Sequence, residues 1–418
     1  MAKRFGLRSL GCVLILGISA CQTLQKHELE AKVAPEVLAG YLKDKPENLK
    51  RLYAPILLQG KRNLVLNHVR IGIAAMEERH FDLAEASFDI ALKSIETIYA
   101  DNEEAEKALS LWTKENIKDF KGEPYERAMA YYYRGLLYLV VGDYENARAS
   151  FKGGMLQDAF AADKQDRSDF AALAYLEGWA SKCWGNENLA KDSFAEAVGL
   201  NAALSAPKPG QNLLAIFETG HPPQKLADGD SNEKLTFKRG PNSSEKKLRV
   251  SLAKVSNTVA PAEDIFYQAS TRGGRPIDSI LAGKVNFKDG ANTVGDGLLV
   301  AGTATLAVSS NRNTAIAGAA MMFAGLVAKA AAAAAQPDAD IRAWDNLPDK
   351  VFLTTFAQHD DSQNPTAHVL DAAGDVIAGS AVDLPIIGGD DACKFSWARN
   401  LSALAVNDRA PGSFVPEK

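Results

Sequence analysis

The residues of this 418-residue chain that could form a catalytic or metal site are few and scattered. The run His359-Asp360-Asp361 could ligate a metal or orient a base, and Cys393 with His359 or His368 could pair a thiol nucleophile with a base. The first run lies in the polar stretch QHDDSQNP, which is typical of a solvated turn. The pairing of Cys393 with a histidine is supported only by the residue types, and not by any motif or spacing. Weaker candidates for anion contacts are Arg272, Arg275 and His221.

Common enzyme motifs are absent from the chain. Gly283-Lys284 is followed by Val285 where a phosphate-binding loop needs Ser or Thr, and Gly295-Asp296-Gly297 is followed by Val300 where a dinucleotide loop needs glycine. There is no HExxH, no CxxC pair and no GxSxG. We therefore expect no catalytic residue, no metal site and no cofactor, and a protein that is not an enzyme.

One residue does have a predicted covalent chemistry. Lys3, Arg4 and Arg8 precede a short apolar run, LGCVLILGISA, which ends at Cys21. This pattern predicts a bacterial lipoprotein signal peptide over residues 1–20, with diacylglycerol on the Cys21 thiol and a further acyl chain on its freed amine. The alternatives are an ordinary signal peptide cut after Ala20 or an uncleaved anchor. Gln22, by similarity to enterobacterial lipoproteins, favours the outer membrane over retention in the inner one.

Charge and cysteine usage agree with a periplasm-facing chain. Loss of residues 1–20 removes Lys3, Arg4 and Arg8 and changes the formal net charge from −5 to −8. An acidic chain is a poor candidate for nucleic-acid binding. Cys183 and Cys393 would then be in an oxidising compartment. A disulfide between them is possible, but a buried free thiol at Cys183, beside Trp184, is the favoured interpretation.

The elements before residue 204 are predicted to be repeated helices. The segment 127–159, RAMAYYYRGLLYLVVGDYENARASFKGGMLQDA, has the small and aromatic spacing of a tetratricopeptide repeat, and the spacing recurs before and after it. Small residues would lie where two helices cross, and aromatic residues would fill the space between hairpins. The predicted packing residues are Gly72, Phe81, Ala84, Phe88, Gly135, Tyr138, Tyr144, Ala147, Phe151, Gly178, Ala190 and Phe194.

The repeats are interrupted. Phe88, Phe151 and Phe194 are 63 and 43 residues apart, where a tandem array would give about 34. We expect an extra helix over 99–122 and a longer loop or helix end over 158–170. Three repeats could form a concave surface that binds a partner protein, or could be a plain helical packing domain.

The second half predicts a smaller α+β domain. Pro207, Pro209 and Gly210 end the helices, and strands are expected at 213–218, 248–255, 351–357 and within 367–384. The predicted fold class is therefore mainly α. Its parts are a helical repeat domain at 21–204, a linker at 205–212, an α+β domain at 213–390 and an irregular tail at 391–418.

Two segments of this half allow alternative interpretations. Residues 297–335 are rich in alanine and glycine and predict a helical hairpin, which is either a buried pair covering a sheet or a membrane-inserting or oligomerising element. The second segment could contact anionic lipid or glycan, although a solvated hairpin is favoured; its basic residues are Lys234, Lys238, Arg239, Lys246, Lys247 and Arg249.

Four segments occur in the order found in a known group of proteins: the Cys21 motif, KGEPYERAMAYYYRGLLYLVVGDYENA, LLAIFETGHPP and DIRAWDNLP. Together they resemble an uncharacterised family of bacterial TPR-containing outer-membrane lipoproteins found near curli-secretion-like and penicillin-binding-protein-activator-like lipoproteins. The resemblance spans most of residues 21–390 and supplies no catalytic residues. It implies a scaffold for an envelope, secretion or surface-structure complex. The alternative is a glycan- or lipid-binding or enzymatic C-terminal domain that the repeats tether.

Overall fold

The computed structural model describes residues 31–100, 119–159, 168–229, 234–241, 246–271, 339–359, 363–371 and 373–401. The segments predicted as signal peptide, extra helix and Ala/Gly-rich hairpin therefore lie wholly or largely outside the described residues. The described N-terminal half is helical. Its helices are α2 (Pro35–Leu42), α3 (Lys50–Gln59), α4 (Leu64–Glu77), α5 (Phe81–Ala100), α7 (Pro124–Val140), α8 (Tyr144–Ala159), α9 (Ala171–Cys183) and α10 (Glu187–Leu200).

Three helix hairpins repeat one contact. In α4–α5, α7–α8 and α9–α10, a glycine of the first helix faces a phenylalanine ring of the second. A Cβ added to any of these glycines would lie closer than 3.0 Å to that ring, so only glycine allows the approach. The pairs are Gly72 with Phe88, Gly135 with Phe151, and Gly178 with Phe194.

The other predicted packing residues occupy related positions. Ala84, Ala147 and Ala190 are buried on the second helices. Tyr144 is buried as well, whereas Phe81 and Tyr138 are partly buried against the same core. Half-buried Tyr138 has the Arg134 guanidinium 3.8 Å from its ring centroid.

The turn inside each hairpin has one residue with a left-handed backbone. Gly142 and Gly185 have φ values of 72° and 83°, as expected for glycine after a helix. Arg79 is at this position in the first hairpin, with φ of 62°. A side chain is unfavourable in this conformation. Arg79 donates to the backbone oxygen of Trp397 (3.4 Å), far along the chain.

The C-terminal half forms three sheets. A five-stranded sheet has the order β10-β11-β1-β7-β6, a four-stranded sheet the order β5-β4-β8-β9, and β2-β3 is a separate hairpin. The strands are β1 (Leu213–Thr219), β2 (Gln224–Asp228), β3 (Lys234–Lys238), β4 (Lys247–Leu252), β5 (Val255–Val259), β6 (Glu263–Asp264), β7 (Lys350–Phe356), β8 (Thr366–Leu370), β9 (Val382–Asp383), β10 (Ile386–Gly389) and β11 (Lys394–Asn400), with α11 (Ile265–Ser270) after β6.

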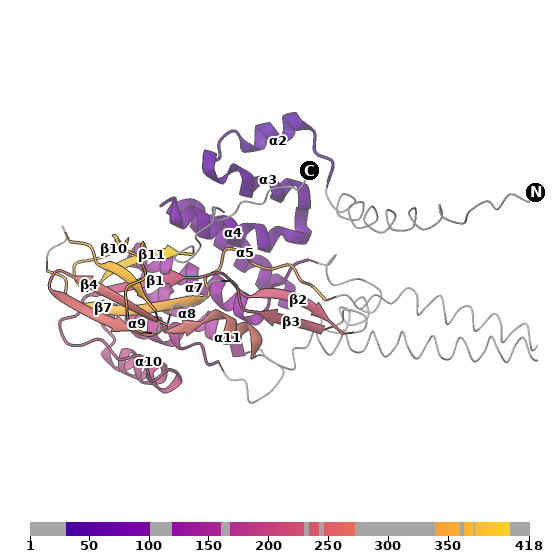
Figure 1. Ribbon diagram of the computed structural model, residues 1–418. Helices are drawn as coiled ribbons and strands as arrows, with labels where there is room; N and C mark the ends of the chain where they lie inside the picture. Colours follow the sequence, from indigo (N-terminus) through magenta and orange to yellow (C-terminus); the bar gives the residue numbers. More distant parts are fainter. Residues whose placement is uncertain are drawn as a thin grey trace, which may run out of the picture.

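Helices and sheets pack as three layers (Figure 1). Alternate residues of β1 point to opposite sides, as in any strand. Leu214 and Ile216 belong to the core shared with the helices. Leu213 and Phe217 belong to a second core, between the five-stranded and four-stranded sheets. The five-stranded sheet is thus the middle layer, and both of its faces are covered.

The prediction of a mainly α fold is wrong. The protein is a mixed α/β protein, because its strands build a full layer against the helices instead of a small appended part. The irregular tail is also a wrong prediction where it is described. Residues 394–400 form β11, which pairs in parallel with β1 at an inner position of the sheet. In the part of the chain that is described, no helix is long and apolar enough to cross a membrane.

Candidate functional site at the junction of helices and sheet

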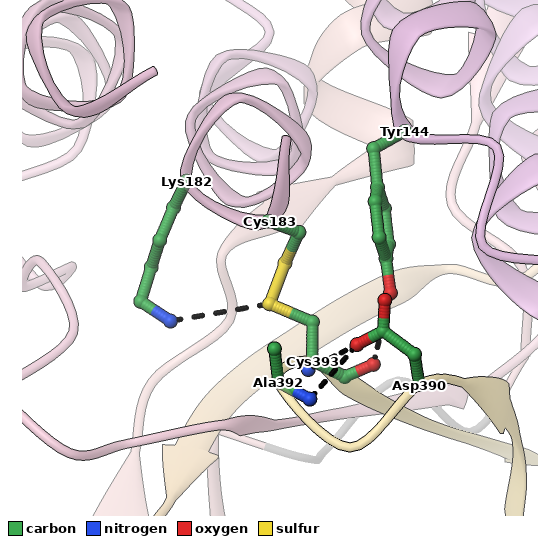
Figure 2. Close-up of a disulfide and its surroundings, with 6 residues drawn as sticks. All are labelled: Tyr144, Lys182, Cys183, Asp390, Ala392 and Cys393. Carbon is green, nitrogen blue, oxygen red and sulfur yellow. Dashed lines mark hydrogen bonds between the residues drawn. A yellow bond between two sulfur atoms is a disulfide. The ribbon is translucent and has the colours of Figure 1, made fainter. Parts of the chain in front are cut away.

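A disulfide joins the helical layer to the C-terminal strand (Figure 2). Cys183 is the last residue of α9, and Cys393 immediately precedes β11. The two are 210 residues apart in sequence, and their Cα atoms are 5.7 Å apart. The favoured prediction of a free thiol at Cys183 is therefore wrong. The hypothetical pairing of the Cys393 thiol with His359 or His368 fails for the same reason.

Several groups surround this disulfide (Figure 2). The Lys182 Nζ atom lies 4.0 Å from the Cys393 sulfur and 4.7 Å from the Trp179 ring centroid. Burial lowers the Lys182 pKa from its ordinary value, and Glu187 opposes that change. Tyr144 donates to the Cys393 backbone oxygen (3.1 Å). The turn before β11 is thus held to the ends of two helices.

A buried carboxylate lies deeper in the same junction. Glu218, near the end of β1, has no exposed surface. Its Oε1 accepts hydrogen bonds from Tyr132 (3.0 Å) and from the Trp397 indole (2.9 Å). Its Oε2 accepts from Tyr133 (2.7 Å) and lies 3.3 Å from Arg399 Nε. Helix α7 and strand β11 therefore meet at one side chain of β1.

The tyrosines of this cluster stay neutral. Burial, followed by the negative charge of Glu218, raises the pKa of both Tyr132 and Tyr133 well above the ordinary value. Both hydroxyls therefore remain donors to the carboxylate. A buried carboxylate is costly unless it is hydrogen-bonded and paired. Glu218 meets this condition through groups of its own chain, which makes the cluster a connection between layers.

The DIRAWDNLP segment lies along the inner helices. Trp344 is buried, with its ring 5.8 Å from that of Tyr133 and 6.2 Å from that of Phe88, and its backbone N–H donates to Glu126 Oε1 (2.9 Å). Arg70 of α4 donates to Asp345 (2.7 Å) and to the Ala343 oxygen (3.0 Å). This extended segment covers part of the face that a repeat protein would otherwise offer to a partner.

Part of the basic segment is paired with acidic side chains of the same chain. Arg239 makes paired hydrogen bonds to Asp349 (2.8 and 2.9 Å) and to Asp264 (3.0 and 2.7 Å). Lys234 and Lys238 are exposed at the two ends of strand β3, and Arg249 is on β4 opposite His368. The segment is thus a hairpin followed by a strand.

A second buried carboxyl accepts a hydrogen bond from the first turn of α9. Glu263 Oε2 accepts from the backbone N–H of Ala172 (3.2 Å), and Oε1 accepts from Gln268 (2.9 Å). Burial is the largest cause that raises the Glu263 pKa to about 8, and the charges of Asp169 and Asp158 add to it. This carboxyl therefore binds a proton near neutral pH.

The predicted chemical residues are not brought together. His359 follows β7, His221 follows β1, and burial lowers the pKa of His221. Asp360, Asp361, Arg272, Arg275 and Cys21 lie outside the described residues. Among the residues that are described, no group of three His, Cys, Asp or Glu side chains is placed to hold a metal ion.

The residues that do converge were not singled out in the sequence. Glu218 ends an otherwise apolar strand, and this placement of a charge was an available signal. Arg399 and Trp397 had no such signal, because they lie in a segment with Pro and Gly on both sides. Comparisons with models of known protein families, with curated proteins and with solved structures found no match.

Proposed function

We propose that the protein is a non-catalytic scaffold of the bacterial cell envelope, anchored through lipid on Cys21 and facing the periplasm. The observation that supports it most is the repeated hairpin, in which three helix pairs have the same glycine–phenylalanine contact. Stacked hairpins of this kind present extended surfaces to partner proteins. The disulfide suits an oxidising compartment, as the predicted signal peptide does.

The partner surface is the outer side of the helical layer. Helix α9 is buried from Ala171 through Ser181, because α8 and α10 flank it and it packs into the core shared with the sheet. Helix α8 instead buries only one side, and Leu156 on this helix is exposed. Ile90 on α5 is exposed as well. Exposed apolar side chains on these two helices are suited to contact another protein.

The test is crosslinking and capture from native membranes. The bait proteins are the wild type, Cys21→Ser, a double variant Ile90→Asp/Leu156→Asp, and the control Val255→Asp on β5 of the far sheet. Val255 is also exposed, so the control places the same kind of substitution, with one added charge instead of two, on the other side of the molecule. We expect one envelope protein to be captured by the wild type and by the control, and lost with the double variant.

Loss with Val255→Asp but retention with the double variant would contradict a docking surface on the helices. Retention of capture and of membrane localisation in Cys21→Ser would contradict the lipid anchor. The alternative, in which repeats only tether an independent glycan-binding or enzymatic domain, is less favoured because helices and sheets share one core.

A further inference from the structure

The two sulfurs of the interlayer disulfide have different surroundings. Cys393 is 3% exposed, because it lies between the end of α9 and the start of β11. Cys183 is more exposed. Thiol–disulfide exchange needs access to one sulfur only, since the other is the leaving group. Of the two cysteines, Cys183 is therefore the more accessible to an incoming thiolate.

The leaving group has a cation beside it. When a disulfide is attacked, the departing sulfur becomes a thiolate, and exchange is faster when this thiolate is stabilised. Lys182 Nζ is 4.0 Å from the Cys393 sulfur, which is the sulfur that leaves when Cys183 is attacked. Figure 2 shows the ammonium directed at the disulfide. Charge and access thus favour the same direction of cleavage.

The surface next to Cys183 presents one large aromatic side chain in a shallow, mainly polar depression. Trp184 is 45% exposed, which is high for a large aromatic side chain in a folded layer. It borders a shallow depression of about 410 Å³ that Gly185, Asn186, Glu187 and Asn188 complete. An exposed indole beside the attackable sulfur offers a docking point for another protein.

We propose that the Cys183–Cys393 disulfide is an exchangeable link on which a dithiol–disulfide oxidoreductase acts at Cys183, with Cys393 as the leaving thiolate beside Lys182. A thiolate of the oxidoreductase attacks Cys183 Sγ and forms a mixed disulfide, while the electron pair of the broken S–S bond goes to Cys393 Sγ. The second thiol of the oxidoreductase then loses its proton and attacks the oxidoreductase sulfur of the mixed disulfide. This step releases Cys183 as a thiolate. The oxidoreductase becomes a disulfide, and both cysteines of this chain take up protons as thiols.

The reverse sequence forms the bond. An oxidised oxidoreductase accepts attack from the Cys183 thiolate, and the Cys393 thiolate beside Lys182 then displaces it. The proposal depends on the proposed function in one respect only, which is the compartment where the protein would encounter such an oxidoreductase. The purified chain tests the chemistry without reference to the scaffold role.

The first experiment measures the reduction of the purified folded protein by dithiothreitol, through alkylation and mass. The proteins are the wild type, Lys182→Met, Lys182→Arg and the control Lys191→Met, an exposed lysine of α10. We expect a rate proportional to dithiothreitol concentration, slower by about threefold to tenfold in Lys182→Met. Lys182→Arg should restore most of the rate, and Lys191→Met should equal the wild type.

A rate that is independent of dithiothreitol and equal to the rate of global unfolding would overturn the proposal, since the link would then open only in unfolded molecules. Equal rates for Lys182→Met and the wild type would also overturn it. A second experiment replaces dithiothreitol with a thioredoxin-type protein. Trp184→Ser should slow this reaction and leave the dithiothreitol rate unchanged, and an unchanged rate with the protein reductant would contradict docking at Trp184.

Discussion

At the scale of single residues, Arg79 shows a local conformation that a distant contact stabilises. It occupies the left-handed position that is glycine in the other two hairpins. Its guanidinium lies over the Trp397 ring, 5.9 Å from the centroid, and donates to the Trp397 backbone oxygen. The side chain thus makes a contact with β11, although the backbone conformation is unfavourable for a residue other than glycine.

Substitution at this position separates the two effects. Arg79→Gly loses the contact and relieves the backbone, whereas Arg79→Ala loses the contact and keeps the unfavourable φ. We expect Arg79→Ala to be less stable than Arg79→Gly by about 1 kcal/mol in urea unfolding. Gly185→Ala is the matched control and should cost a similar amount. Equal stability of the two Arg79 variants would show that the backbone is not under strain there.

Glu263 predicts a pH dependence of stability. Its folded pKa of about 8 lies above the ordinary carboxyl value of 4.5, so the folded state binds the proton more tightly than the unfolded state. Stability should therefore fall as the pH rises from about 4.5 to about 8, by an amount on the order of a few kcal/mol. Above this window the buried carboxylate is charged, and the loss is complete.

Glu263→Gln keeps the shape of the side chain and removes the titration. The variant should lose most of the decline in the free energy of unfolding between pH 5 and pH 8, measured by urea titration. The nearby acids Asp169 and Asp158 are unchanged in this variant. A variant that declines as steeply as the wild type would assign the pH dependence to another group.

At the scale of elements, the hairpin contact gives a paired test of packing. An alanine at Gly135 would place its Cβ against the Phe151 ring, whereas an alanine at Gly199, on α10, meets no atom within 4 Å. Gly135→Ala should therefore destabilise the protein by about 1–3 kcal/mol. Gly199→Ala should stabilise it by about 0.5–1 kcal/mol, because alanine favours the helix. Thermal unfolding of both variants checks the difference, and two changes of the same sign would contradict the packing argument.

Local patterns predicted the elements better than their assembly. Three predicted strands are confirmed, with ends that differ from the observed ones by at most three residues: 213–218, 248–255 and 351–357. They could be predicted because alternation and apolar runs are local signals. The pairing of β1 with β11 could not be predicted in this way. Parallel strands have no shared turn, and Leu213 pairs with Lys394 across most of the second half of the chain.

The junction was hidden for the same reason. Glu218 becomes part of a buried cluster only in the folded protein, where side chains of α7 and β11 both donate hydrogen bonds to it. Tyr133 and Trp397 are 85 and 179 residues away from Glu218 in sequence, and such separations do not indicate a contact. The disulfide is a similar case, because a separation of 210 residues gives no indication of proximity.

At the scale of the whole molecule, the position of β11 makes the C-terminal segment essential to the fold. Removal of residues 391–418 would delete the strand next to β1 and leave Glu218 buried without Trp397 and Arg399. Removing the partners of a buried charge costs about 3–5 kcal/mol. The exposed edge of β1 would add a site for aggregation.

A chain cut after residue 390 should therefore fail to give a monodisperse folded product in size-exclusion chromatography and circular dichroism. The matched control is Cys183→Ser/Cys393→Ser, which removes the disulfide and keeps β11 in the sheet. We expect this control to fold, with a free energy of unfolding lower by about 2–5 kcal/mol. A truncated chain as stable as the double serine variant would mean that the covalent link alone, and not the parallel pairing of β11 with β1, holds the layers together.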